Sequence, residues 1–187
     1  MISRAIVFLV SLAIASYAVA AEPDVTAIIH VNVIPMDREH VLPDQTVLVE
    51  NGIISAVGRN VRVPSGARLI DGRGKFLSPG LADMHTHSES REEMKVYLAN
   101  GVTTVLHMGG ASNEFVGQRV PLLNRGERPG PHVYLALRID GTPRYGQFVV
   151  TTRDEARWAV RLAKTNGYRF IKVYNTLSPD AFAAAAD

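Results

Sequence analysis

The sequence contains no cysteine among its 187 residues, so no disulfide can indicate the compartment of the protein. A cysteine-free chain is compatible with any redox compartment. The chain also lacks a strong charge of either sign, since 20 Lys and Arg residues stand against 18 Asp and Glu residues. No basic run marks a nucleic-acid surface, and we expect no nucleic-acid partner.

Long apolar runs are also scarce, and the main one lies at the N-terminus. Arg4 precedes an apolar stretch over residues 5–14, and Ala18-Val19-Ala20 has the pattern of a signal-peptidase site. We expect residues 1–20 to be a signal peptide, cleaved before Ala21, and the protein to be exported to the periplasm or secreted. An uncleaved membrane anchor is the alternative, but the stretch is marginal against the roughly 20 residues that a span needs. We expect no stable membrane span after cleavage.

Residues 21–76 predict a small all-β domain. Strands rich in β-branched residues are expected over residues 25–34, 46–50, 53–57 and 67–70, with a polar loop over 35–44. Asn51-Gly52 separates the two central strands, and Asn-Gly is a strong hairpin signal because a type I′ turn needs positive φ at both positions. A unit of this size is hardly stable alone.

From residue 77 onward the pattern changes to alternating strands and helices. A short strand ends at His85-Thr86-His87, and further strands are expected over 102–106, 132–139 and 170–174. Helices are expected over 90–100, 114–124 and 152–166 and from Ser178 onward, with Pro121 interrupting the second of them. This alternation predicts parallel βαβ units and therefore an α/β fold.

The first of these strands ends in a His-x-His motif. Side chains alternate along a strand, so His85 and His87 point to the same side. Two imidazoles at that separation can bind one metal ion, and imidazole suits zinc and its first-row neighbours. The spacing alone leaves open that the two histidines are unrelated.

The sequence around this motif resembles a known family. Residues 79–87, Pro-Gly-Leu-Ala-Asp-Met-His-Thr-His, closely resemble the strand-1 signature of the amidohydrolase superfamily, metal-dependent hydrolases built on a (β/α)8 barrel. Residues 47–58 and 69–75 resemble the small β-domain that precedes the barrel in this family, and residues 100–105 resemble strand 2. The similarity runs from about Thr26 to the end of the chain.

The resemblance implies the N-terminal half of a TIM-like barrel preceded by a small β-sandwich-type domain. In the family, strands from the far C-terminus complete this sandwich, so the resemblance implies that the domain over residues 21–76 is incomplete. A complete barrel takes about 250 residues. Residues 77–187 have room for strands 1 to 4 only, and four of eight strands cannot close a barrel. We therefore expect a truncated barrel, either because the sequence is a fragment or because the reading frame is shortened.

Lys172 lies on the fourth of these strands, on the same face as Phe170 and Tyr174. In the binuclear enzymes that the chain resembles, the strand-4 lysine reacts with carbon dioxide, and the resulting carboxylate bridges two metal ions. The resemblance therefore assigns metal ligation to His85, His87 and carboxylated Lys172, with a pair of divalent ions, expected to be zinc. The alternative is a lysine whose amine reaches solvent at the strand end. The motif does not distinguish zinc from manganese or iron.

Three more residues are candidates for orienting a ligand or contacting substrate. Asp83 shares the face of His85 and His87 and would orient a ligand histidine. His107 follows the second strand, where relatives often carry an acidic residue; a merely solvated histidine is the alternative. Tyr174 follows Lys172 and could contact substrate or simply pack.

The resemblance implies hydrolysis of amide or peptide-like C–N bonds by a metal-activated hydroxide. Residues 171–174, Ile-Lys-Val-Tyr, followed by Ser178-Pro179, most resemble the imidazolonepropionase-like and prolidase-like branch, so a small-molecule or dipeptide-like substrate is expected. The family takes its acid–base residue from later strands, which would lie beyond Asp187, so no catalytic residue and no activity are expected for the 187-residue chain alone. The alternatives are a mononuclear deaminase of the same superfamily, against which Lys172 counts, and an inactive fragment or binding remnant.

Overall fold

The protein is described by a computed structural model that covers residues 24–145 and 148–187. The expected signal peptide, residues 1–20, lies outside the described residues. The chain divides into two compact units between Ser78 and Pro79. Within the described residues no helix is both long and apolar enough to cross a membrane.

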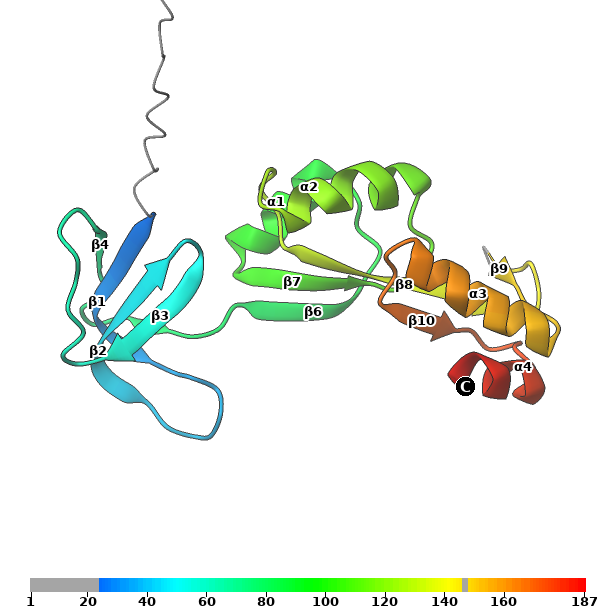
Figure 1. Cartoon of the computed structure of the whole chain (residues 1–187), viewed down its shortest axis with the longest axis horizontal. Helices are drawn as coiled ribbons and strands as arrows, with labels where there is room; N and C mark the ends of the chain where they lie inside the picture. The colour runs from blue at the N-terminus through cyan, green and yellow to red at the C-terminus, as the bar shows by residue number, and fades with distance from the viewer. Residues whose placement is uncertain (1–23, 146–147) are drawn as a thin grey trace, which may run out of the picture. The chain divides into compact units, whose positions relative to one another are not determined.

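The first unit is a mixed β-sheet with the strand order β3-β2-β1-β4, and β5 pairs with β1 (Figure 1). The strands are β1 (Val25–Val33), β2 (Leu42–Glu50), β3 (Ile53–Gly58), β4 (Arg68–Asp71) and β5 (Phe76–Leu77). β2 pairs antiparallel with both β1 and β3, whereas β4 and β5 run parallel to β1. Buried valines, Val31, Val33 and Val47, form its core.

The predicted hairpin of the first unit is confirmed. Asn51 and Gly52 have φ values of 51° and 79°, as the turn between β2 and β3 requires. The predicted loop over residues 35–44 is too long, because Leu42 already pairs with Val33 of β1. A register shift between β1 and β2 lies just before this pair, which is why alternation of residue types did not reveal it.

The second unit is a parallel sheet with the strand order β10-β8-β7-β6, and the short strand β9 pairs with β8 (Figure 1). Its strands are β6 (Leu81–Thr86), β7 (Val102–His107), β8 (His132–Asp140), β9 (Phe148–Val149) and β10 (Phe170–Val173). Its helices are α1 (Arg91–Ala99), the π-helix η1 (Phe115–Arg119), α2 (Val120–Asn124), α3 (Arg153–Thr165) and α4 (Pro179–Ala186). All its strand pairs are parallel, so the predicted α/β class is confirmed.

Local capping signals start three of these helices where the sequence predicts. Ser90 and Thr152 each accept a hydrogen bond from the backbone of a glutamate three residues later, which closes a capping box. Ser178 caps α4 with Pro179 as its first residue. In the chain, α1 therefore follows β6, and α3 precedes β10.

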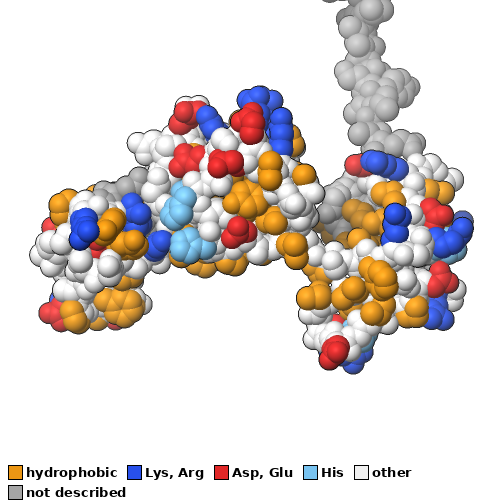
Figure 2. Space-filling view, turned by 180° about the vertical axis from the view of Figure 1, so that it is seen from behind, with side chains coloured by type: hydrophobic (Ala, Val, Ile, Leu, Met, Phe, Trp, Pro, Cys, Tyr) orange, Lys and Arg blue, Asp and Glu red, His pale blue; other side chains and the backbone are white. Residues whose placement is uncertain are grey.

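The helices cover one face of the parallel sheet. Val133, Leu135, Leu137 and Ile139 of β8 are buried against helix residues such as Met94, Phe115 and Ala159. Ile171 of β10 packs against the same helical layer. Because side chains alternate along a strand, Arg138 and Lys172 lie on the opposite face, away from the helices. Hydrophobic side chains also remain exposed at the surface of both units (Figure 2).

Candidate metal centre

The C-terminal end of β6 carries the two histidines of the His-x-His motif. His85 and His87 are both exposed, and their ring centroids lie 5.4 Å apart. Figure 2 shows histidine side chains at the surface of the second unit. Both side chains are therefore accessible to an ion or a substrate from solvent.

Lys172 of β10 meets the first of these histidines. Its Nζ lies 3.4 Å from Nε2 of His85, although β7 and β8 separate the two strands in the sheet. Three strand spacings amount to about 14 Å in a flat sheet, in which side chains on one face stand roughly parallel. The contact therefore requires a sheet that curves toward this face, so that side chains from β6 and β10 converge.

His87 is held in one ring orientation by a backbone group. Its Nδ1 lies 2.9 Å from the carbonyl oxygen of Gly109, in the loop after β7. A carbonyl oxygen only accepts, so Nδ1 carries the proton and Nε2 of the neutral ring carries the lone pair. A histidine that ligates a metal through one nitrogen almost always donates from the other in this way.

These donors fit part of a metal site. No group of three or more His, Cys, Asp or Glu side chains in residues 24–145 and 148–187 is arranged to hold a metal ion. The convergent set is instead two imidazoles and one amine, His85, His87 and Lys172. A lysine amine becomes an anionic oxygen donor when it is carboxylated, and imidazole with carboxylate oxygen suits zinc and other first-row ions.

Asp83 and Tyr174 both lie beside this set. Asp83 Oδ1 accepts a hydrogen bond of 3.1 Å from the backbone N–H of His85, so it contacts that residue through the backbone. The Tyr174 ring centroid lies 5.5 Å from Lys172 Nζ and 5.7 Å from Arg138 Cζ. Arg138 is directly opposite Lys172 in the sheet register, and both side chains lie beside this aromatic ring.

His107 lies at the end of β7 and is 1% exposed, so the alternative of a solvated histidine is wrong. Its ring centroid is 5.6 Å from that of His87 and 5.5 Å from that of Phe115. Burial lowers the pKa of His107 most strongly; the nearby His87 also lowers it, while the Glu89 carboxylate raises it. The ring is therefore neutral near pH 7.

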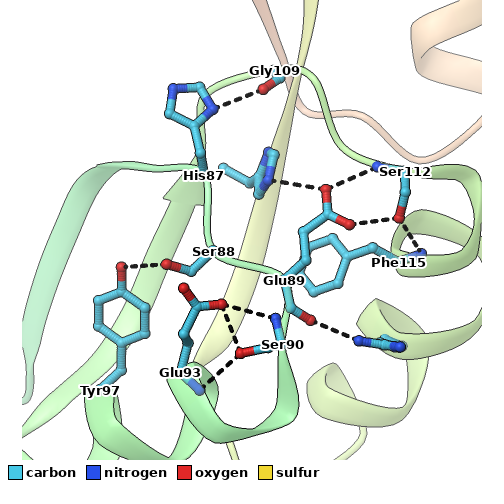
Figure 3. Close-up of polar contacts among 11 residues, drawn as sticks. His87, Ser88, Glu89, Ser90, Glu93, Tyr97, Gly109, Ser112 and Phe115 are labelled. Carbon is cyan, nitrogen blue, oxygen red and sulfur yellow. Dashed lines mark hydrogen bonds and ion pairs between the residues drawn. The ribbon is translucent and has the colours of Figure 1, made fainter.

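Glu89 is the residue near this set that sequence reasoning missed. Its carboxylate accepts hydrogen bonds from the backbone N–H of Ser112 at 2.9 Å and from the Ser112 hydroxyl at 2.5 Å (Figure 3). It also lies 3.6 Å from Nε2 of His107. The available signal was its position: Glu89 follows His87 by two residues, in the same spacing that separates the two motif histidines.

Comparison with known proteins gives short sequence matches and a longer structural one. No protein-family model matches the chain. A dihydroorotase from Geobacter metallireducens is 39% identical over 71 residues, which are 33% of this chain and 17% of that protein. An adenine deaminase from Listeria innocua is 38% identical over 65 residues, which are 32% of this chain and 11% of that protein.

Among solved structures, a candidate prolidase from Bifidobacterium longum matches 88% of this chain and 46% of its own, with a TM-score of 0.75 and 22% identity. At that identity the likeness shows a shared fold. Together, the sequence matches and the fold place the chain in the amidohydrolase superfamily, as the His-x-His segment predicts. The chain spans about half the length of that solved structure and a smaller share of the two sequence relatives.

Proposed function

We propose that the protein is a metal-dependent amidohydrolase that cleaves amide or peptide-like C–N bonds, and that His85, His87 and carboxylated Lys172 are metal ligands. The observation that carries this proposal is the 3.4 Å approach of Lys172 Nζ to His85 Nε2. A histidine and a lysine 87 positions apart in the sequence meet where the family's two-metal site would need them.

The same contact supports the proposed architecture. A sheet that curves strongly enough to bring β6 and β10 side chains together is expected for four consecutive strands of a (β/α)8 barrel. Apart from the short β9, the strands of this sheet follow one another in chain order, and the helices of the described residues pack on one face, as in such a barrel. In this proposal, the mixed sheet of the first unit is the sandwich-type domain that precedes the barrel.

The chemistry divides between the ions and the chain. Divalent ions, two zinc ions in this proposal, would be held by His85, His87 and carboxylated Lys172 and would supply a water of lowered pKa and polarise the scissile carbonyl. The chain fixes His87 through the Gly109 carbonyl, so that Nε2 is free to ligate. Tyr174 and Arg138 lie beside Lys172, on the face where substrate would approach. A dipeptide-like substrate fits this mixed aromatic and cationic surface.

A deaminase of the same superfamily is the second candidate, because the adenine deaminase match is nearly as strong as the dihydroorotase match. The two candidates differ in metal content. A two-metal hydrolase needs the bridging carboxylate on Lys172, whereas a mononuclear deaminase does not. The position of Lys172 beside His85 favours the hydrolase.

The test is metal stoichiometry and hydrolysis of blocked dipeptides, measured on the native protein from its source, which in this proposal includes the later barrel strands, and on its Lys172→Met variant. We expect two ions per native chain and at most one in the variant. Activity should fall by more than the about 10–100-fold that loss of an outer partner of a ligand costs. Lys164→Met, in the exposed last turn of α3, is the matched control and should change neither quantity. Two ions in the Lys172→Met variant would refute the assignment of Lys172, and one ion in the native protein would favour the deaminase.

A further inference from the structure

We propose that Glu89 is a positioning residue that orients His87 through the loop between β7 and η1. This loop, residues 108–114, carries the carbonyl group that fixes the His87 ring, and Glu89 ties the loop down (Figure 3). The inference rests on the proposed function, because it takes His87 to be a metal ligand. It adds a residue to the site that the His-x-His motif and Lys172 do not include.

The first step is the dependence of His87 on the loop. The described polar contact of the His87 ring is the 2.9 Å bond to the Gly109 carbonyl. If that carbonyl turned away, the neutral ring could carry its proton on either nitrogen, and Nε2 would be available as a ligand only part of the time. The orientation of the Gly109 peptide group therefore sets how much of the His87 ring has an unprotonated Nε2 that can bind a metal.

The second step is that the loop backbone does not fix this peptide group by itself. Gly109 and Gly110 have φ values of 90° and 84°, and a pair of glycines has more conformational freedom than any other dipeptide. The preceding side is anchored by the Met108 N–H, which donates to the Thr86 carbonyl at 2.9 Å. The part of the loop that follows Gly110 is held through Ser112, whose backbone N–H bonds to Glu89.

The third step is the Glu89 anchor itself. Its carboxylate accepts from both the backbone N–H and the hydroxyl of Ser112, and the Ser112 hydroxyl oxygen also accepts from the Phe115 N–H at 3.2 Å. The backbone of Glu89 is held as well, because Arg119 Nη1 donates to its carbonyl oxygen at 3.0 Å. Glu89, in the loop after β6, is therefore bonded through its carboxylate to Ser112 in the loop after β7 and through its backbone carbonyl to Arg119 of η1.

The fourth step is the packing beneath the anchor. His107 is buried between His87 and Phe115, and neither of its ring nitrogens has a hydrogen-bond partner among the described residues. The His107 ring supports the His87 ring by contact, and the Glu89 carboxylate lies 3.6 Å from Nε2 of His107. Glu89 therefore touches both the loop that orients His87 and the ring on which His87 packs.

The experiment compares Glu89→Ala and Glu89→Gln with Glu92→Ala in the full chain. Glu92 is an exposed acid in the first turn of α1, so its loss matches the charge change without touching the loop. The first measurement is the tautomer of His87, read from nitrogen NMR of the metal-free protein at a pH where imidazole is neutral. The second is the affinity and the visible spectrum of bound Co²⁺.

The native protein and Glu92→Ala should hold His87 with its proton on Nδ1. Glu89→Ala should give a mixture of tautomers, bind Co²⁺ about tenfold more weakly and show an altered spectrum. Glu89→Gln should restore both readouts, because its amide can still accept from the Ser112 N–H and donate to the Ser112 hydroxyl.

A Glu89→Ala variant that folds and matches Glu92→Ala in both measurements would overturn the proposal. If Glu89→Ala does not fold, Ser112→Ala replaces it and should shift the tautomer in the same direction; an unchanged tautomer there would equally overturn the proposal. Failure of the proposed function looks different: His87→Ala would then leave Co²⁺ binding unchanged, whatever the tautomer result.

Discussion

Gly109 is a position where the structure leaves no room for a side chain. A Cβ built there would lie 2.6 Å from the Cβ of Arg138, and its φ of 90° is in the region that favours glycine. We expect Gly109→Ala to lower the free energy of unfolding by about 2–4 kcal/mol, since strain in the backbone and overpacking both contribute. Urea unfolding of the full chain measures this loss.

Gly126 supplies the control for that substitution. It also has a positive φ, of 71°, but a Cβ there would meet no atom within 4 Å. Gly126→Ala should therefore cost only the backbone strain, about 1–2 kcal/mol. If the two variants lost the same free energy of unfolding, Arg138 would have to move aside freely. The close packing of the loop on β8 would then contribute nothing to stability.

At the scale of elements, Asp140 joins the end of β8 to the segment after β10. Its side chain is fully buried, and Oδ1 accepts hydrogen bonds from the Gly141 N–H and from both the N–H and the hydroxyl of Thr176. The Thr176 hydroxyl is the largest cause that lowers the pKa of Asp140, followed by the backbone hydrogen bonds, while burial opposes the shift.

A lowered pKa means that the unfolded chain binds the proton more readily than the folded chain. The stabilisation by Asp140 is therefore fully present above the ordinary aspartate pKa, near 3.8, and is lost as the pH falls through the lower folded value. Thr176→Val should raise the folded pKa and move acid unfolding to a higher pH. Urea midpoints across an acid pH series measure this shift.

The matched control is Thr165→Val, because that hydroxyl donates to the backbone carbonyl of Arg161 inside α3 rather than to a carboxylate. It should change stability by a constant amount at every pH. An acid transition of Thr176→Val that coincides with the native one would show that the Thr176 hydroxyl does not set the charge state of Asp140.

Elements whose signals are local could be predicted from the sequence. The Asn51-Gly52 turn and the capping boxes at Ser90 and Thr152 depend on residues within a few positions of each other, so their residue types alone indicate the structure. The interrupted helix near Pro121 was predicted as one irregular segment. The structure resolves it into a π-helix, closed by the Val120 N–H bond to the Phe115 carbonyl, and a short α-helix.

Contacts between distant residues could not be predicted in this way. Glu89 and Ser112 are 23 positions apart, and Asp140 and Thr176 are 36 apart, so no local pattern links them. The pairing of His85 with Lys172, 87 positions apart, was accessible only because both residues belong to motifs of a family with a known strand order. An acidic residue outside any motif, such as Glu89, cannot be assigned to the site from the sequence, because its contacts form only when the fold brings the two loops together.

At the scale of the whole molecule, the sequence predicts an exported protein whose first twenty residues are removed. Arg4, the apolar stretch over 5–14 and the small residues at 18 and 20 have the pattern of the three parts of a signal peptide. Removal leaves Ala21 at the N-terminus, shortly before β1 begins at Val25. The mixed sheet would then start almost at the mature N-terminus.

The cleavage site gives a direct test of this prediction. Signal peptidase requires a small residue immediately before the cut, so Ala20→Leu should block processing, whereas Ala13→Leu in the apolar stretch should not. N-terminal sequencing and intact mass of the exported fraction should find Ala21 first in the native protein and in Ala13→Leu. The Ala20→Leu protein should retain the leader and stay with the membrane fraction. A native protein that keeps Met1 and remains membrane-bound would instead identify the apolar stretch as an anchor.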